Sequence, residues 1–243
     1  MKLIINADDF GMSKAINYGI IEAFLSGSIT STTMMVNMNA TIHATTLLNQ
    51  YPTLPVGLHF NMTFGKPITN VKTLTNKSGY FMKPQDNPDI SLFSSEEIYQ
   101  EIKGQYELFI KLTKKKPTHF DSHLYAHQIW PNVKEQMNKF AKEVNLPVRD
   151  LKINDFQFVN FLRNNSLLSK DQNTADHIKA LFFTFKQYDI CELMVHPGYV
   201  DQFIYENSSY NIQRVFELEI LNSQLFKQQL RDNKITLVSY KDV

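Results

Sequence analysis

The sequence predicts an α/β fold in which a parallel sheet, open or closed into a barrel, is flanked by helices. Apolar runs bounded by turn residues alternate with amphipathic stretches, as in successive βαβ units. Polar residues gather where several of these runs end. With 243 residues and 43% hydrophobic content, the chain is long enough to bury one substantial core. We find no linker, repeat or low-complexity tract, so residues 1–243 are expected to form a single domain.

About seven mostly parallel strands are expected from the apolar runs. They span 3–7, 31–38, 56–61, 118–123, 148–153, 193–196 and 235–240. The expected helices span 13–25, 41–50, 95–112, 132–143, 174–185 and 211–231. Ser13 is a candidate N-cap for the first helix, and a Ser-Ser-Glu-Glu pattern opens the third. Residues 65–94 are rich in proline and polar residues and are interpreted as a long loop or lid over the site, and 155–172 as irregular.

Composition narrows the function classes. Lys plus Arg total 25 against 24 for Asp plus Glu, a net charge of +1 that gives no reason to expect nucleic acid or an anionic membrane as partner. No stretch approaches the roughly 20 apolar residues of a membrane span, and the N-terminal apolar run is too short for a signal peptide. A soluble, cytoplasmic protein is expected. Cys191 is the only cysteine, which leaves imidazole and carboxylate as the plausible metal ligands.

Two predicted strands carry polar side chains on one face only. The two-residue period of a strand separates them from the apolar residues on the opposite face. The polar faces comprise His59, Asn61 and Thr63 in one strand, and His119, Asp121 and His123 in the other. One face of each strand is therefore expected to pack, and the other to carry chemistry.

Two further strand ends contribute acid and base groups. The first strand ends in Asp8 and Asp9, and the sixth ends in His196. Each has a plain structural explanation when taken alone, because an aspartate can cap a helix and a histidine before Pro-Gly can be a turn residue. The carboxyl ends of parallel strands meet at one edge, so all four groups should converge. Burying them together would be costly without a metal or mutual hydrogen bonds. His127 lies four residues after His123 and is a second candidate ligand on a helical turn.

Taken in order, these motifs resemble the YdjC family of carbohydrate deacetylases, the group that contains the chitooligosaccharide deacetylase. The resemblance covers nearly the whole chain. It rests on Asn-Ala-Asp-Asp-Phe-Gly at 6–11, Gly-Leu-His at 57–59, Asp-Ser-His at 121–123, His-Pro-Gly-Tyr at 196–199 and the closing strand at 235–240. It implies a distorted (β/α) barrel and a divalent metal held by Asp9, His59 and His123. It also implies Asp8 as catalytic base and His196 as a second acid/base group.

Further residues are candidates for contacts with the substrate or with the metal ligands. Asp121 or another acceptor is expected to orient a ligating imidazole through its second nitrogen. His127, Tyr125 and Tyr199 are further candidates, and the two tyrosines and Trp130 suit either a sugar platform or ordinary packing. The identity of the metal has two interpretations. Imidazole ligands favour zinc or a similar ion, whereas the resemblance implies magnesium.

The expected activity is removal of acetyl groups from N-acetylated mono- or oligosaccharides such as chitooligosaccharides. A metal can lower the pKa of its bound water from 15.7 to about 7 and can polarise the acetyl carbonyl. Two alternatives fit the same residues: metal-dependent hydrolysis of another bond, such as a phosphoester, and a non-catalytic sugar-binding protein. Apolar residues of the 211–231 helix suit either packing on the barrel or a homodimer interface.

Overall fold

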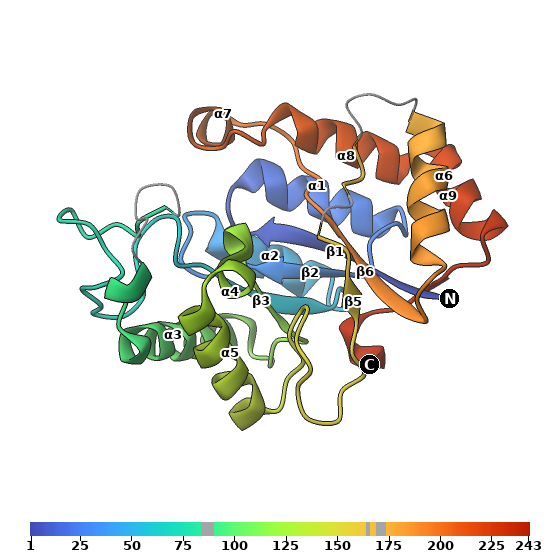
Figure 1. Ribbon diagram of the computed structural model, residues 1–243. Helices are drawn as coiled ribbons and strands as arrows, with labels where there is room; N and C mark the ends of the chain where they lie inside the picture. The colour runs from blue at the N-terminus through green and yellow to red at the C-terminus, as the bar shows by residue number, and fades with distance from the viewer. Residues whose placement is uncertain (84–89, 164–165, 169–173) are drawn as a thin grey trace.

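A computed structural model describes residues 1–83, 90–163, 166–168 and 174–243 of the chain. Its centre is a curled sheet with the strand order β4-β3-β2-β1-β6-β5, and β7 pairs with β1 (Figure 1). Every pairing between these strands is parallel. The strands are β1 (Lys2–Phe10), β2 (Ser31–Met34), β3 (Val56–Phe60), β4 (Phe120–Ser122), β5 (Asn160–Phe161), β6 (Ile190–Val195) and β7 (Thr236–Leu237). The α/β class and the distorted barrel are confirmed, the sheet being a half-barrel with edges at β4 and β5.

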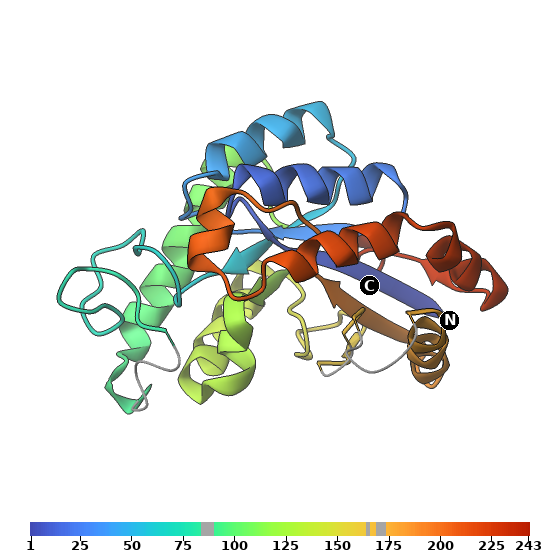
Figure 2. The ribbon, with the colours of Figure 1, turned by 90° about the horizontal axis from the view of Figure 1, so that it is seen from above.

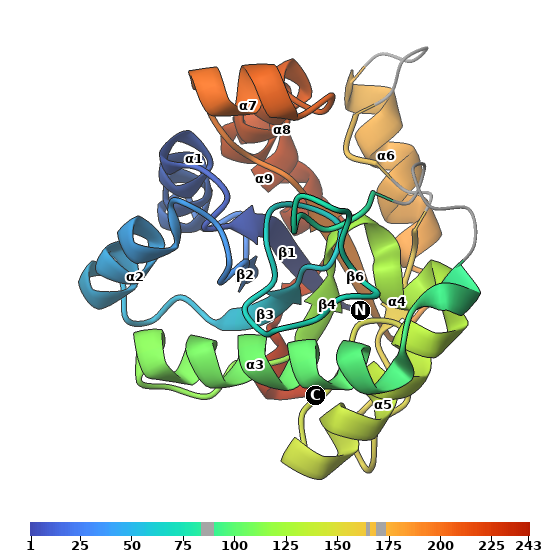
Figure 3. The same cartoon turned by 90° about the vertical axis from the view of Figure 1, so that its left-hand side faces the viewer.

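Helices surround the outside of the curl (Figure 3). They are α1 (Lys14–Leu25), α2 (Thr41–Gln50), α3 (Ser95–Thr113), α4 (Ala126–Ile129), α5 (Pro131–Val144), α6 (Thr174–Phe185), α7 (Gln202–Asn207), α8 (Ile212–Asn222) and α9 (Gln224–Asp232). Seen from above, α1 and α8 lie side by side over one part of the sheet (Figure 2). Short 3₁₀ turns occur at Ile90–Leu92, His123–Tyr125 and Tyr240–Asp242. The main core lies between sheet and helices. No helix in the described ranges is long and apolar enough to cross a bilayer.

Local capping explains where the predicted helices begin. The Ser13 side chain accepts a hydrogen bond from the Ile16 amide, which confirms it as the N-cap of α1. Ser94 caps α3 in the same way, and the acidic first turn and Lys111 in the last turn complement the helix dipole. These signals are local, so the sequence located both helices closely.

The predicted 211–231 helix is two helices. Ser223 is extended, with ψ of 148°, and its side chain accepts a hydrogen bond from the Phe226 amide at the start of α9. The apolar period continues across the break, so it gave no warning of a turn. Ile212 and Phe216 of α8 remain half exposed, and a homodimer stays a prediction. The short helices α4 and α7 were not predicted.

The predicted strand at 148–153 is wrong. Val148 makes only isolated bridges, to Phe120 and Leu151. The backbone then turns away, because Asp150 has a φ of 60°, which a strand does not accommodate. The strand that pairs with β6 instead is β5, inside the stretch expected to be irregular.

The 65–94 segment is a loop in its described parts, and residues 84–89 lie outside the described residues. Its beginning is tied to α3. The carboxylate of buried Glu101 accepts from the amides of Ile68 and Thr69, both at 2.9 Å. One turn earlier, Glu97 accepts from the amides of Lys72 and Thr73 at 3.0 and 2.7 Å. The segment is therefore fixed along α3, and its role as a lid stays a prediction.

Candidate metal centre

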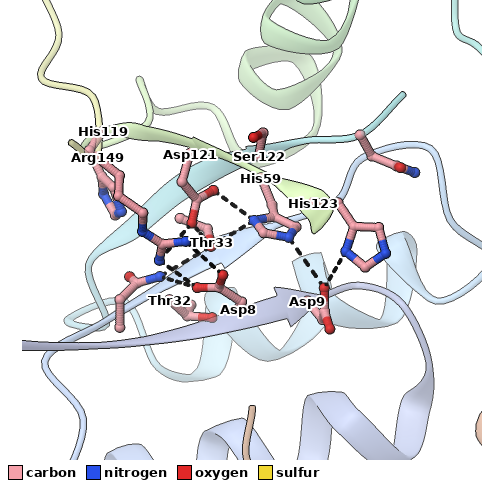
Figure 4. A network of polar contacts seen from close by, with 12 residues as sticks. Asp8, Asp9, Thr32, Thr33, His59, His119, Asp121, Ser122, His123 and Arg149 are labelled. Carbon is pink, nitrogen blue, oxygen red and sulfur yellow. Dashed lines mark hydrogen bonds and ion pairs between the residues drawn. The ribbon is translucent and has the colours of Figure 1, made fainter. Parts of the chain in front are cut away.

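The two aspartates at the end of β1 point toward the same cluster, although neighbours in a regular strand face opposite sides. The register of β1 against β2 shifts between Ala7 and Phe10, and Asp9 has a φ of 72°. Such a bulge re-aims a side chain. Positive φ at a non-glycine residue costs about 1–3 kcal/mol and is retained where the surroundings enforce it. Both Asp8 and Asp9 consequently reach the cluster in Figure 4.

Asp9, His59 and His123, the ligand set that the family resemblance implies, lie close together. Oδ1 of Asp9 lies 3.0 Å from Nδ1 of His123 and 3.3 Å from Nε2 of His59. One donor atom from each residue fits within 4.8 Å of the others. Asp9 and His59 are each 1% exposed, and His123 is half-buried. A carboxylate oxygen and two imidazole nitrogens at this spacing suit a divalent cation.

Asp121 fixes the orientation of His59. Nδ1 of His59 donates to Oδ1 of Asp121 at 2.7 Å, which turns Nε2 toward Asp9 (Figure 4). The other Asp121 oxygen accepts from Thr33 at 2.8 Å and lies 3.0 Å from Nη2 of Arg149. Burial alone would lower the pKa of His59, but Asp121, with a smaller contribution from Asp9, raises it to about 10. A carboxylate behind the far nitrogen is the usual support of a metal-binding histidine.

Arg149 lies at the centre of the buried network, although no role was predicted for it. Its Nη1 and Nη2 donate to the two oxygens of Asp8 at 2.8 and 2.7 Å, and its Nε donates to Glu192 at 2.8 Å. Burial by itself would raise the pKa of Asp8, but the charge and hydrogen bonds of Arg149 outweigh it and hold that pKa below its usual value. Asp8 is therefore ionised at neutral pH. An arginine inside a run expected to be buried was the available signal.

Arg214 binds the Asp9 oxygen that does not face the two histidines. Its Nη2 lies 2.7 Å from Oδ2 of Asp9. Burial opposes ionisation of Asp9, but His123 and Arg214 outweigh it and keep the pKa of Asp9 well below its usual value. Arg214 and Glu217 are three apart on the buried face of α8. Two charged residues three apart, on the face of a helix that is expected to pack, could have been noticed in the sequence. Nothing in the sequence connected them to Asp9.

His196 stands at the end of β6 beside the same cavity. Its amide donates to the carboxylate of Glu217, and its ring lies 5.3 Å from the Tyr210 ring, centroid to centroid. The cavity measures about 540 Å³ and is lined by Asp8, Asp9, His59, His123, Tyr125, His196, Arg214 and other residues. Lys83 and Arg163 add positive charge to its lining. The cavity can hold a small ligand against the candidate metal ligands.

Three other predicted positions lie off this cavity. Both ring nitrogens of His127 are engaged, Nδ1 with Ser122 at 2.6 Å and Nε2 with the Arg149 carbonyl at 2.9 Å. Burial lowers the pKa of His127 to about 3, so its neutral ring serves the fold. Tyr199 is 42% exposed and donates to Glu22, and Trp130 packs against Phe93 with ring centroids 5.6 Å apart.

The fold and the site together define an α/β half-barrel protein with a candidate metal centre at the carboxyl ends of its strands. The family model described as YdjC-like protein matches residues 2–232, and the chain belongs to this family. Carbohydrate deacetylase 2 of Listeria innocua serovar 6a is 44% identical over 245 residues, which cover 100% of this chain and 99% of that protein. A chitooligosaccharide deacetylase of Yersinia enterocolitica is 35% identical, with 99% and 98% of the two chains covered.

A solved structure from Enterococcus faecalis V583 has the same fold throughout. It superposes with a TM-score of 0.88 at 28% identity, over 99% of this chain and 98% of the other. That protein is provisionally described as a cellobiose-phosphate cleavage protein.

Proposed function

We propose that this protein is a divalent-metal-dependent hydrolase that removes acetyl groups from N-acetylated mono- or oligosaccharides. The observation that carries the proposal is the grouping of Asp9, His59 and His123 within 4.8 Å, with Asp121 behind His59. The carbohydrate deacetylases among its relatives support an acetylated sugar as substrate.

The donor set fits a divalent cation, because one oxygen of Asp9 and one nitrogen of each histidine lie within 4.8 Å of one another. Neutral imidazoles favour zinc, cobalt or nickel, and the family resemblance favours magnesium. A bound cation supplies a Lewis acid for the acetyl carbonyl and lowers the pKa of water. Asp9, His59 and His123 are the residues that would hold it.

Asp8 and His196 supply the proton transfers in this proposal. Arg149 keeps Asp8 ionised, and in this proposal the carboxylate orients the attacking water and accepts its proton. His196 in its charged form delivers a proton to the departing amine, because an amine anion is a poor leaving group. Each such transfer is typically worth about 10²–10⁴-fold in rate.

The test measures acetate released from N-acetylglucosamine oligomers with added divalent metal. We expect His59→Ala, His123→Ala and Asp9→Asn to lose both metal binding and activity. Asp8→Asn should keep the metal and lose about 10²–10⁴-fold in rate. Exposed Asp232→Asn on α9 is the matched control for the aspartate variants and should keep native metal binding and activity. Full activity after chelation, or in His59→Ala, would refute the proposal.

A second candidate is metal-dependent cleavage of a phosphorylated sugar. The description of the Enterococcus relative favours it, as do Lys83 and Arg163 in the cavity lining. A panel of acetamide, ester and phosphate substrates separates the two candidates, since phosphate release without acetate release would select the second.

A further inference from the structure

The side chain of Arg214 reaches from α8 to Asp9, the candidate metal ligand at the end of β1. It is 2% exposed, and its Nη2 donates to Oδ2 of Asp9 at 2.7 Å. Its Nε donates to the backbone carbonyl of Tyr210 at 2.8 Å, one turn earlier. Two nitrogens of the guanidinium are thus fixed, one by the backbone just before α8 and one by the carboxylate of Asp9.

The two oxygens of Asp9 therefore have different partners. Oδ1 faces His123 and His59 at 3.0 and 3.3 Å, whereas Oδ2 is taken by Arg214. A free carboxylate can bind a cation through one oxygen or through both. With Oδ2 held, binding through both oxygens would require breaking a short charge-assisted bond in a buried site.

We propose that Arg214 is a positioning residue of the metal centre, which keeps Asp9 a one-oxygen ligand and leaves coordination positions open for water and substrate. Catalytic metal sites have few protein ligands and an open position, whereas closed sites are structural. The use of those positions in hydrolysis rests on the proposed function. The proposal that Asp9 binds the metal through one oxygen does not depend on which reaction the protein catalyses.

The bonding of Arg214 differs from that of Arg149. Arg149, the other buried arginine of the site, uses Nε, Nη1 and Nη2 on carboxylates. Arg214 has one buried nitrogen, Nη1, without a hydrogen-bond partner in the described part of the chain, and the residue lines the cavity. A buried donor without a partner is unfavourable. Unlike the nitrogens of Arg149, Nη1 of Arg214 is therefore not engaged by a carboxylate of the described residues.

The positive charge of Arg214 determines whether its removal strengthens or weakens metal binding. A positive guanidinium beside Asp9 repels a cation and withdraws negative charge from its ligand. Replacing it by a neutral side chain should let Asp9 bind through both oxygens and hold the metal at least as tightly, while the open positions decrease. If Arg214 positions Asp9, a variant should lose turnover but keep the metal. If Arg214 had only a structural role, the variant should lose metal binding and turnover together.

The test uses metal-free full-length protein, titrated with Co²⁺ while its visible absorption is recorded. Arg214→Gln should bind Co²⁺ at least as tightly as the native chain, with weaker d–d bands because the coordination number rises. Its acetate release with saturating metal should fall about 10–100-fold. Arg214→Lys keeps the charge but not the fork, and should fall between the two. Exposed Arg231→Gln on α9 is the control and should match the native chain.

Two results would overturn the proposal: a tenfold or greater loss of Co²⁺ affinity in Arg214→Gln, or an unchanged Co²⁺ spectrum. If Arg214→Gln fails to fold, the spectrum and affinity of Arg214→Lys decide instead. If the native chain releases no acetate, the proposed function fails, but the Co²⁺ titrations still decide how Asp9 binds.

Discussion

Replacing Asp121 by asparagine tests whether the carboxylate behind His59 supports metal binding. Asp121 is fully buried, and its two oxygens face three donors. These are Nδ1 of His59 at 2.7 Å, Oγ1 of Thr33 at 2.8 Å and Nη2 of Arg149 at 3.0 Å. Asparagine offers one acceptor oxygen and one amide donor. Whichever way the amide turns, a donor meets a donor, or His59 loses its acceptor.

The size of the effect follows from two opposing terms. Residues that orient a metal ligand are typically worth 10–100-fold in affinity or activity, or about 1.4–2.7 kcal/mol. Against this, the native metal must displace a proton from His59, whose pKa is about 10. Asp121→Asn lowers that pKa and so weakens the competition. The 10–100-fold range is a net effect that already includes this relief, and we expect a loss of about tenfold in metal affinity at pH 7.

The pH dependence makes the prediction specific. Native affinity should rise as pH approaches 10, because His59 then gives up its proton more easily. The variant has less to gain, so its deficit should widen between pH 7 and pH 9. Competition against a calibrated chelator measures both affinities, and exposed Asp232→Asn is the control. Affinities within threefold of native at both pH values would refute the role of Asp121.

Three further predictions concern protonation and packing. Because the pKa of His59 is raised from 6.5 to about 10, the free energy of unfolding of metal-free protein should fall as the pH rises from 6.5 to 10. Metal binding at pH 8 should release about one proton, which calorimetry in buffers of different ionisation enthalpy measures. Binding without proton release would contradict the raised pKa of His59. Glu101→Ala should cost about 2–4 kcal/mol in urea unfolding, because it frees the amides of Ile68 and Thr69, whereas exposed Glu107→Ala should change stability by less than about 0.5 kcal/mol. Gly19→Ala would normally stabilise a helix by about 0.5–1 kcal/mol, but here its Cβ would lie 2.5 Å from Cα of Gly198 and displace the turn after His196; a melting temperature and acetate release at or above native values would count against that packing.

The half of the candidate site that follows local periodicity could be predicted from the sequence. His59 lies on the polar face of β3 and Asp121 on that of β4, as the two-residue period predicts, whereas His123 begins the 3₁₀ turn that follows β4. Helix starts at Ser13 and Ser94 depend on neighbours three residues away, so they were also readable. The α/β class followed because apolar runs and amphipathic stretches alternate along the whole chain.

Residues whose role depends on distant partners were decided only by the tertiary structure. Arg149 meets Asp8 across 141 positions, and Arg214 meets Asp9 across 205. The bulge at Asp9, which turns two adjacent aspartates toward one cluster, lies within the pairing of β1 with β2. A buried charge is tolerable only with its partner in place, and no local pattern names that partner. The sequence by itself determined which strand ends carry polar groups. Folding decided which charges hold them in position, because those contacts join segments that meet only in the packed sheet.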